Sequence, residues 1–468
     1  MSAADELRVG WCPGALRPML SGDGLIVRVK PRGMALPVAR AIGIAAAASR
    51  HGNGLLDLTA RANLQIRGVT EASLPALTVE LDAMGLLDAD AGAEARRNLL
   101  ASPLIGLDPA ALFDIRPTVA ALESALAGAE GLDVLPSKFG IAVSDGGAMP
   151  LGDVSADLRF EATRDGGFAL RLDGDDGVVS FCSASDVSAV ALRLARGFVA
   201  ASAVDPSLHR MRDLVKTVGA AEIFAGVGLD SLHPGSPSPP RFAWSSSPSG
   251  GGDAADRVRL LPHWGRGTVR STVEGATEPP PSPTMPHCVG RLAVAGTLGV
   301  AAPFGRLDAA QFDALARGAR RSGASELRMT PWRALLVPDL APAALDRLAE
   351  TCAAAGLIVD PADPRLRVAA CAGAPGCRRG TTPVLDDAAR WAKLLGPGHG
   401  TTGIALHVSG CAKGCAHPGA ASLTLVGTEG RYALVADGTA ADVPVASGLD
   451  AGEAYRLLKT TLSWDRHP

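Results

Sequence analysis

The sequence predicts an α+β fold in which one structural unit occurs twice along a chain of 468 residues. The first observation behind this prediction is an internal repeat, in which residues 36–85 match a second stretch at a constant offset of 271 positions without a gap. The matched pairs are Leu36 and Leu307, Thr59 and Thr330, Leu64 and Leu335, Leu74 and Leu345, and Gly85 and Gly356. The second observation is that both copies show the same order of strand and helix patterns.

Each copy is expected to begin with a short apolar strand and to continue with a helix of small apolar residues. The predicted strands are Leu25–Val29 and Leu292–Val294, and the predicted helices are Leu36–Ala48 and Ala309–Arg320. Two more strands follow in each copy, Leu55–Thr59 and Asn63–Ile66 in the first, Glu326–Thr330 and Ala334–Val337 in the second.

An amphipathic helix closes each copy. Its apolar positions are Leu74, Leu77 and Leu81 in the first copy, and Leu345 and Leu348 in the second. Gly85 or Gly356 comes directly afterwards and is the expected C-terminal cap. Strand–helix–strand–strand–helix is a ferredoxin-like order, and duplication should relate the two half-domains by a pseudo-twofold axis, with space for a large ligand between them.

A larger α+β unit is predicted after each half-domain. Both larger units contain a strand with the word Val-Ser, at Val143-Ser144 and at Val408-Ser409. The predicted divisions are a half-domain at 1–88, a larger unit at 89–233, a linker at 234–286, a half-domain at 287–362 and a larger unit at 363–468. The linker is rich in Pro, Ser and Gly and cannot bury enough apolar surface to order itself.

Four cysteines in the last unit carry the clearest chemical signal: Cys371 and Cys377, then Cys411 and Cys415. Four thiolates are the usual ligands of a [4Fe–4S] cluster, one for each iron. Zinc is an alternative, but structural zinc sites usually space paired cysteines by two to four residues, which the Cys371–Cys377 gap does not match. Unliganded thiols are the third possibility. Because only one copy carries the four cysteines, the scaffold predicts a single active centre.

The remaining cysteines are scattered along the chain, at Cys12, Cys182, Cys288 and Cys352. They show no paired spacing. The small apolar neighbours of Cys182 and Cys352 predict buried, unreactive thiols at these two positions.

Charge and composition restrict the classes of partner. A net charge of −3, a pI near 6.3 and an aromatic content of 4% argue against a nucleic-acid partner. No uncharged run reaches 18 apolar residues, and the acidic start of the chain lacks the pattern of an export signal. We therefore expect no membrane span and a cytoplasmic location.

The cysteine spacing and several short words resemble the sirohaem-type sulfite and nitrite reductase superfamily. Within it the chain is most similar to the precorrin-3B synthase family, through Gly10–Gly14, Arg17-Pro18, Gly22–Leu25 and Ser409–Pro418. The reductases more often have Pro-Asn where this chain has Ala412-Lys413. The resemblance implies the duplicated nitrite/sulfite reductase-like architecture, with two ferredoxin-like half-domains alternating with two larger α+β domains.

The resemblance to the precorrin-3B synthase family also implies a reaction. Precorrin-3A would be hydroxylated at C20 and closed to a γ-lactone, with O2 as oxidant and NADH as the source of electrons. The implied cofactors are a [4Fe–4S] cluster and, in some members, a mononuclear non-haem iron. Because the sequence shows no nicotinamide or flavin domain, the electrons are expected from a separate reductase. The alternatives are a sirohaem-dependent assimilatory sulfite or nitrite reductase and, in another class, a non-catalytic electron carrier or a zinc-stabilised binding protein.

Basic residues are expected to hold the polyanionic tetrapyrrole, because arginine meets carboxylates through two parallel hydrogen bonds. Positions that match those of the reductases assign Arg61, Arg97 and Lys138 to substrate or oxidant, and Asn63 and Arg67 to the cofactor. The reductases have a second basic residue two positions after that lysine, where this chain has Gly140. We interpret the missing cation as space for a different substrate. For each arginine taken singly, a solvated surface charge is the competing interpretation.

Residues beside the cluster cysteines complete the candidate site. Lys413, between Cys411 and Cys415, could neutralise developing negative charge. His407 and His417 could ligate iron or donate a hydrogen bond, or could be structural. Gly398–Gly403 matches G-x-G-x-x-G, but it follows a helix and precedes a strand, the reverse of the dinucleotide fingerprint, so we interpret it as a loop.

Overall fold

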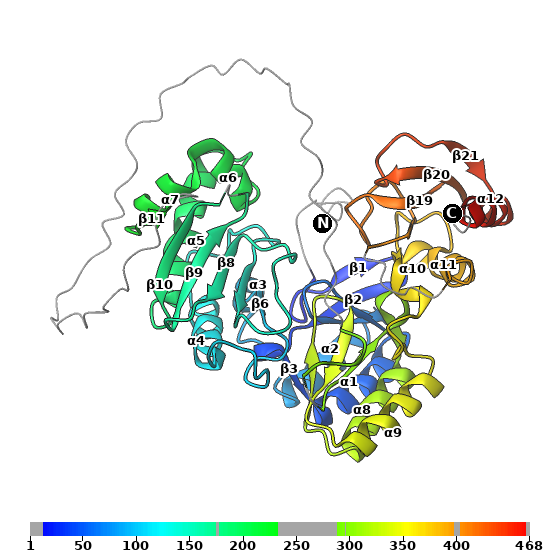
Figure 1. Cartoon of the computed structure of the whole chain (residues 1–468), viewed down its shortest axis with the longest axis horizontal. Coiled ribbons are helices and arrows are strands. Elements are labelled where there is room, and N and C mark those ends of the chain that lie inside the picture. The colour runs from blue at the N-terminus through cyan, green and yellow to red at the C-terminus, as the bar shows by residue number, and fades with distance from the viewer. Residues whose placement is uncertain (1–12, 175–176, 233–287, 295, 397–402, 465–468) are drawn as a thin grey trace.

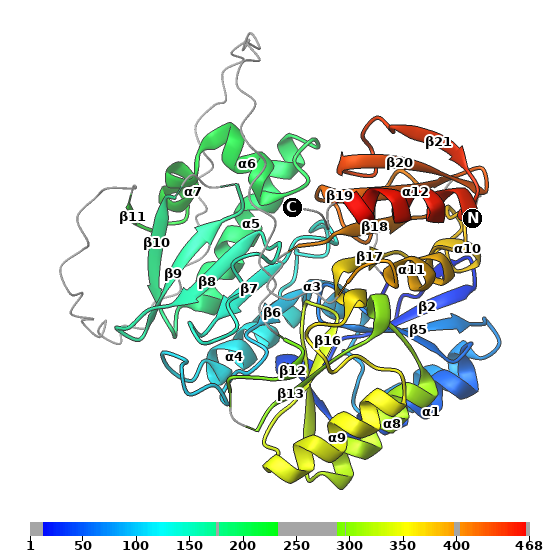
Figure 2. The same cartoon turned by 45° about the vertical axis from the view of Figure 1, so that its right-hand side comes forward.

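The structure is a computed structural model that describes residues 13–174, 177–232, 288–294, 296–396 and 403–464. The predicted linker at 234–286 lies outside the described residues. In Figures 1 and 2 the two half-domains lie at the bottom of the picture, and the two larger units stand to the left and right above them.

Each half-domain contains one five-stranded antiparallel sheet. The first sheet has the order β1 (Met19–Ser21), β2 (Gly24–Val29), β5 (Leu64–Val69), β4 (Leu55–Leu58), β14 (Arg306–Asp308). The second has the order β12 (Gly290–Arg291), β13 (Leu298–Ala301), β16 (Ala334–Val337), β15 (Glu326–Met329), β3 (Ala35–Pro37). Four helices cover these sheets, α1 (Val38–His51), α2 (Leu74–Ala83), α8 (Ala309–Arg321) and α9 (Pro342–Ala354), and α1 packs against α8.

The two half-domains exchange their shortest strands. β3 of the first copy pairs with β15 of the second, through Leu36 and Leu327, and β14 of the second copy pairs with β4 of the first, through Leu307 and Leu56. All four of these leucines are buried. Each half-domain therefore completes the sheet of the other, and the pair forms one composite body.

The predicted strand at Leu292–Val294 is wrong, because the strand of the second copy is β13. Residues 292–294 lie in the connection between β12 and β13, where the Leu292 amide donates to the Thr297 carbonyl at 3.1 Å. The offset of the repeat would have placed the strand correctly, since Val27 in the middle of β2 corresponds to Leu298. The strand was instead predicted at residues 292–294 because Leu-Ala-Val is a short apolar run.

The backbone repeats as closely as the sequence does. Five pairs of positions at the offset of 271 have a left-handed φ in both copies: Gly33 and Phe304, Met34 and Gly305, Ala62 and Arg333, Gly68 and Asp339, Gly85 and Gly356. Residues other than glycine rarely adopt this conformation. The copies therefore share their tight turns even where the side chains differ, as at Ala62 and Arg333.

The larger units also repeat one strand plan. In the first, β6 (Leu99–Ala101), β7 (Ile141–Ser144) and β8 (Leu158–Ala162) are parallel, and β9 (Gly167–Leu172), β10 (Val179–Ser183) and β11 (Ser231–Leu232) follow antiparallel. In the second, β17 (Val368–Ala370), β18 (Leu406–Ser409) and β19 (Ala421–Thr428) are parallel, and β20 (Arg431–Gly438) and β21 (Ala446–Leu449) follow antiparallel. Their helices are α3 (Ala91–Arg96), α4 (Arg116–Ala127), α5 (Val187–Val204), α6 (Met211–Val218), α7 (Ala220–Gly226), α10 (Gly373–Gly376), α11 (Val384–Ala392) and α12 (Ala451–Trp464).

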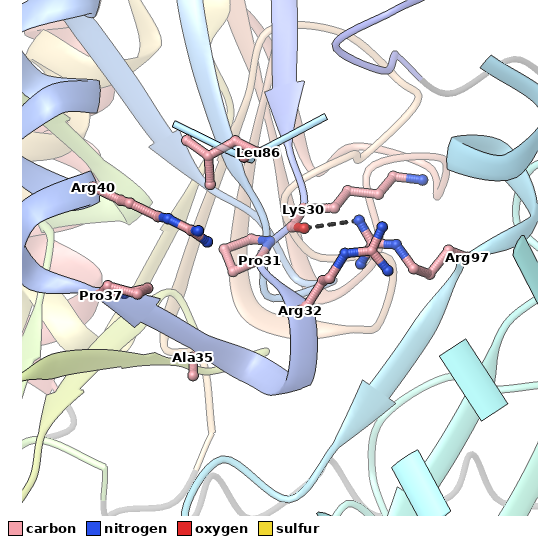
Figure 3. A pocket seen from close by; sticks show the side chains of 9 residues that line it. Lys30, Pro31, Arg32, Ala35, Pro37, Arg40, Leu86 and Arg97 are labelled. Carbon is pink, nitrogen blue, oxygen red and sulfur yellow. Dashed lines mark hydrogen bonds between the residues drawn. The ribbon is translucent and has the colours of Figure 1, made fainter. Parts of the chain in front are cut away.

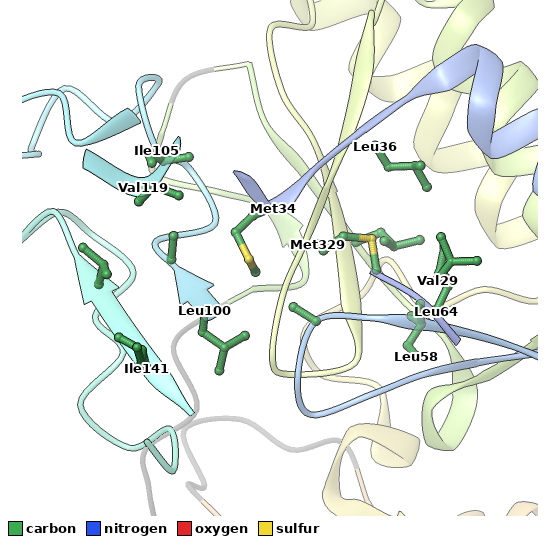
Figure 4. Packing of buried hydrophobic residues seen from close by; sticks show 14 of the residues in the cluster. Val29, Met34, Leu36, Leu58, Leu64, Leu100, Ile105, Val119, Ile141 and Met329 are labelled. Carbon is green, nitrogen blue, oxygen red and sulfur yellow. The ribbon is translucent and has the colours of Figure 1, made fainter. Parts of the chain in front are cut away.

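One hydrophobic core joins both half-domains to the first larger unit, and a separate core fills the second. Figure 4 shows Met34 at the seam, between Leu100 of the first larger unit and Met329 of the second half-domain. In the second core the Trp391 and Tyr432 rings meet edge to face, with centroids 5.0 Å apart.

Helix α5 is, by length and composition alone, apolar enough to cross a membrane. Two arginines interrupt it, and its inner face packs into the core through Val190, Leu194 and Phe198. The core helix of a globular protein passes the same test of length and hydropathy.

Candidate functional site

The four cysteines lie where two parallel strands end. β17 pairs with β18, Ala370 opposite Val408, and Cys371 comes directly after β17. The Cys371 amide donates to the Val408 carbonyl at 3.3 Å, and the Gly410 amide donates to the Cys371 Sγ at 3.2 Å. Because the carboxyl ends of parallel strands meet at one edge of a sheet, the loops that carry the two cysteine pairs lie side by side.

Glycines allow these two loops to touch through their backbones. A Cβ on Gly410 would lie 3.1 Å from the Gly380 Cα and 3.3 Å from the Gly373 Cα. A Cβ on Gly380 would lie 2.7 Å from the Gly373 carbonyl carbon. Side chains at these positions would separate the loops, so the glycines are what lets the two cysteine loops pack against each other.

The four thiols influence one another electrostatically. Burial raises the pKa of the Cys415 thiol, Lys413 opposes this shift, and Cys411, Cys371 and Cys377 raise the pKa further. Among the described residues, no three His, Cys, Asp or Glu side chains converge closely enough to hold one metal ion. A zinc ion needs its four ligands around a single point. A [4Fe–4S] cube takes one thiolate on each of four separate irons, and this donor set of four neighbouring thiols fits it better.

Arg333 contacts the cysteine loops from the second half-domain, and our sequence analysis assigned it no role. Its guanidinium donates to the carbonyl of Ala416, next to Cys415, at 3.3 Å. Burial lowers the pKa of Arg333, while the charges of Asp57 and Cys371 act in the opposite direction. A cation is therefore held close to both cysteine pairs. The preceding residue, Trp332, packs against the first larger unit, so this turn contacts both larger units.

Arg67 contacts the first cysteine loop from the first half-domain. Its guanidinium and the Ser21 hydroxyl both donate to the carbonyl of Gly376, which precedes Cys377. Arg67 is buried and also pairs with Asp23 at 2.6 Å and with Asp57 at 2.9 Å. Burial alone would lower the pKa of Arg67, but these two carboxylates outweigh it and raise the pKa. The structure thus places Arg67 where it orients the cysteine loop through its backbone.

Arg61 and Lys138 come together at the edge of the first larger unit. The Arg61 guanidinium donates to the Lys138 carbonyl at 2.8 Å and to the Asn98 side chain at 3.4 Å. The Lys138 side chain is exposed. A Cβ on Gly140 would lie 2.0 Å from Nη1 of Arg61. Gly140 therefore makes room for the Arg61 guanidinium. This contact explains why position 140 has no side chain, which the sequence alone did not explain.

Arg97 does not join this group, although Asn98 does. Its guanidinium is buried and pairs with Asp88 at 2.9 Å and with Glu123 at 3.4 Å, and it donates to the Lys30 carbonyl at 2.9 Å. Asn63 is also buried, and its backbone amide donates to the Thr59 hydroxyl at 3.1 Å. With its donors engaged in this way, Arg97 suits positioning better than direct contact with a substrate.

His407 and His417 lie beside the second cysteine pair, with ring centroids 5.8 Å apart. His407 is fully buried, and neither ring nitrogen has a hydrogen-bond partner among the described residues. Burial lowers the pKa of His407 to about 4, and the charges of His417 and Arg333 act in the same direction. It is therefore a neutral imidazole. His417 contacts the Ala420 carbonyl through Nε2 at 3.0 Å.

Among the described residues, three of the scattered cysteines lie apart from this site. Cys182, Cys288 and Cys352 are buried, and burial raises the pKa of each thiol to about 12, as expected for unreactive side chains. Cys12 and most of the Gly398–Gly403 loop lie outside the described residues.

Known proteins resemble this chain over most of its length. The family model for the nitrite/sulfite reductase ferredoxin-like half domain matches residues 17–84 and 295–355. A precorrin-3B synthase from Sinorhizobium sp. is 31% identical over 94% of this chain and 85% of its own length. A ferredoxin–nitrite reductase from Synechococcus elongatus is 26% identical over 91% of this chain and 80% of its own length.

A solved structure shares the fold. The NirA protein of Mycobacterium tuberculosis superposes with a TM-score of 0.67 at 18% sequence identity, covering 94% of this chain and 80% of that one. The match of the half-domain model to both copies agrees with the duplication, and together with the shared fold it confirms the predicted α+β architecture.

Proposed function

The chain belongs to the precorrin-3B synthase family of the nitrite and sulfite reductase superfamily, and from this we propose that it hydroxylates precorrin-3A at C20 and closes the γ-lactone in cobalamin biosynthesis. It is an oxidoreductase, as its relatives are. The observation that carries the proposal is 31% identity over nearly the whole of both chains. The match to the nitrite reductase is weaker over a similar length.

Cys371, Cys377, Cys411 and Cys415 would hold a [4Fe–4S] cluster. Such a cluster supplies single electrons when it is bound. The chain's own contribution is to keep the two cysteine loops in contact, through the Gly410 backbone, and to fix them through Arg67 and Arg333. The mononuclear iron of some family members has no assigned ligands in this proposal.

The substrate would be held by its carboxylates. Arg61 and Lys138 present cationic groups at the edge of the first larger unit, and charged hydrogen bonds of this kind are the strong ones. Arg97 would act by positioning, because it orders the backbone next to Asn98, which in turn contacts Arg61. Asn63 would support the turn that carries Arg61. Lys413 is exposed beside Cys415 and would neutralise negative charge there.

The proposal also covers the source of the electrons and the cellular location of the protein. O2 would be the oxidant, and NADH would deliver electrons through a separate reductase in the cytoplasm. A nitrite or sulfite reductase with sirohaem would differ in needing no O2 and in showing the sharp visible bands of a bound macrocycle.

The test is an isotope experiment with the purified holoenzyme, precorrin-3A, a reductant and ¹⁸O₂. We expect one labelled oxygen atom in the C20 hydroxyl group, and no product under argon. Product formed without oxygen, or rapid reduction of sulfite or nitrite to sulfide or ammonia by the same preparation, would overturn the proposal in favour of the reductase.

A further inference from the structure

A cationic pocket lies away from the cysteines, at the opposite end of the first half-domain. It has a volume of about 210 Å³ and is bounded by the end of β2, the start of α1 and the turn after α2. Ser21 and Asp23, at the other end of β2, contact Arg67 and the cysteine loop. Since a strand rises by about 3.3 Å per residue, β2 separates the pocket from that loop by roughly 20 Å.

Four cationic side chains line the pocket: Lys30, Arg32, Arg40 and Arg97. Among the described residues that line it, none is acidic. Arg32 and Arg97 share the carboxylate of Asp88, which lies behind them. In Figure 3 the Arg40 guanidinium points into the pocket from one wall, towards the Arg32 and Arg97 guanidinium groups on the opposite side. The positive charge is therefore concentrated around the cavity while the compensating carboxylates lie outside it.

Arg40 is the least compensated of the four. In the part of the chain that the structure describes, its guanidinium has no hydrogen-bond or ion-pair partner. It lies close to the turn after α2, since a Cβ on Gly85 would lie 3.1 Å from Nη2 of Arg40. Lys30 is also under-compensated: its ammonium group donates to the Glu94 carbonyl at 2.6 Å, and burial, partly offset by the Glu94 charge, lowers its pKa to about 8.

The internal repeat provides a comparison for this pocket. At the offset of 271, Lys30, Arg32 and Arg40 correspond to Ala301, Pro303 and Gln311. Gln311 is satisfied within its own half-domain, because its amide donates to the Ala355 carbonyl at 2.9 Å. The same backbone thus folds in the second copy without any of these cations. Their presence in the first copy is not a requirement of the half-domain fold.

We propose that this pocket binds a phosphate group. Guanidinium forks on opposing walls can each donate to different oxygens of a tetrahedral dianion, whereas a flat carboxylate satisfies one fork. The cavity admits one phosphate group but not a whole nucleotide, so the ligand is either free phosphate or the phosphorylated end of a larger molecule that extends out of the pocket.

Binding can be measured by isothermal titration calorimetry. The full-length holoenzyme is titrated with inorganic phosphate, glucose 6-phosphate or acetate at constant ionic strength. We expect saturable binding of phosphate, and none of acetate. Tighter binding of glucose 6-phosphate than of phosphate would identify a phosphorylated metabolite as the better ligand, and the reverse would identify the free ion. Equal heats from acetate and phosphate would overturn the proposal.

Arg40→Gln should weaken phosphate binding about tenfold or more, because it removes charged hydrogen bonds. Arg320→Gln, which removes an exposed arginine from α8, is the matched control and should leave the affinity unchanged. Hydrogen exchange in the presence of phosphate should slow at residues 30–40 and 84–86, and not at 371–377. Unchanged affinity in Arg40→Gln, or protection confined to the cysteine loop, would show that the pocket is not the site. Should Arg40→Gln fold poorly, Arg40→Lys keeps the charge and is expected to bind with intermediate affinity.

Discussion

The two larger units share one backbone arrangement at the ends of their parallel strands, but only the second places the four clustered cysteines there. Ser102 follows β6 as Cys371 follows β17, and its amide donates to the Val143 carbonyl at 3.1 Å, as the Cys371 amide does to Val408. The Ser102 hydroxyl then accepts from the Asp145 amide at 3.0 Å, where the Cys371 thiol accepts from Gly410. The local backbone is therefore the same, and a hydroxyl replaces a sulfur.

The first larger unit, which lacks the four clustered cysteines, fills its strand ends with polar side chains. Asp108 accepts from the Ala148 amide at 2.6 Å, and Asp145 accepts from the Gly147 amide at 3.0 Å. In the cysteine unit the corresponding loops meet through glycine backbone instead. The strand plan therefore does not depend on a metal. The cysteine loops pack closely through their backbones, where the first unit uses hydrogen bonds to side chains.

The largest effect is expected from Cys371→Ser, which copies the residue of the other unit, and from Cys411→Ser. Both should lose most of the bound iron and sulfide, because one thiolate ligand is missing. Cys182→Ala, at a buried thiol outside the site, is the control and should keep its iron. The measurement is iron and sulfide per chain after anaerobic purification. Full occupancy in both serine variants would refute the assignment of the cluster, and Ser102→Cys should gain no iron in either case.

The second difference between the larger units is how their stability should respond to low pH. His407 in β18 occupies the position of Ala142 in β7, and burial holds its pKa at about 4, below the usual value of 6.5. At neutral pH both folded and unfolded chains carry a neutral imidazole. As the pH falls from about 6.5 to about 4, the unfolded chain binds the proton first, so up to about 3 kcal/mol of stability is lost.

Hydrogen exchange can separate this effect between the two units. Protection of residues 406–409 should decrease between pH 7 and pH 5, after correction for the intrinsic exchange rate, while protection of residues 141–144 should hold. His407→Leu should remove the dependence at 406–409, because leucine does not titrate. If both segments lose protection together, or if the variant keeps the dependence, the imidazole is not the cause.

A third prediction concerns the edge where Arg61 meets the first larger unit. Arg61→Ala should weaken precorrin-3A binding about ten- to a hundredfold, the loss expected for a charged hydrogen bond. Gly140→Ala should have a similar effect without removing a charge, because its Cβ would displace the Arg61 guanidinium. Gly152→Ala has open space around it and serves as the control. Normal affinity in both Arg61→Ala and Gly140→Ala would make Arg61 a structural residue.

Much of this architecture could be predicted from the sequence because duplication leaves a constant offset. The spacing of the cysteines indicated their common site for a similar reason, since four thiols in one unit are rare without a shared ligand. The strand exchange could not be predicted. β3 and β14 are three residues long, and β3 ends at Pro37, so neither has a periodicity that identifies a strand or its partner.

The role of individual arginines was also beyond the sequence. Arg97 matches a reductase word, but Asp88 and Glu123 engage it, and nothing in the spacing of these residues predicts their contact. Arg333 was missed because the match to the reductases drew attention to Arg61, and the repeat aligns Arg333 with Ala62 rather than with Arg61. Contacts between segments that are distant in the sequence decide which arginine keeps N–H donors available for a ligand.

The smallest predicted effect tests this last difference between the half-domains. Arg333→Ala copies the residue of the first half-domain and removes a half-buried cation beside Cys371 and Ala416. A nearby positive charge favours the more negative, reduced form of a cluster, so its removal should lower the reduction potential by on the order of tens of millivolts. Arg333→Lys keeps the charge and should retain most of the potential, and iron content should be unchanged in both variants. The measurement is a redox titration of the cluster followed by electron paramagnetic resonance. Equal potentials in the wild type and Arg333→Ala at full iron occupancy would show that the cation is screened from the cluster, and that Arg333 serves only to hold the Ala416 backbone.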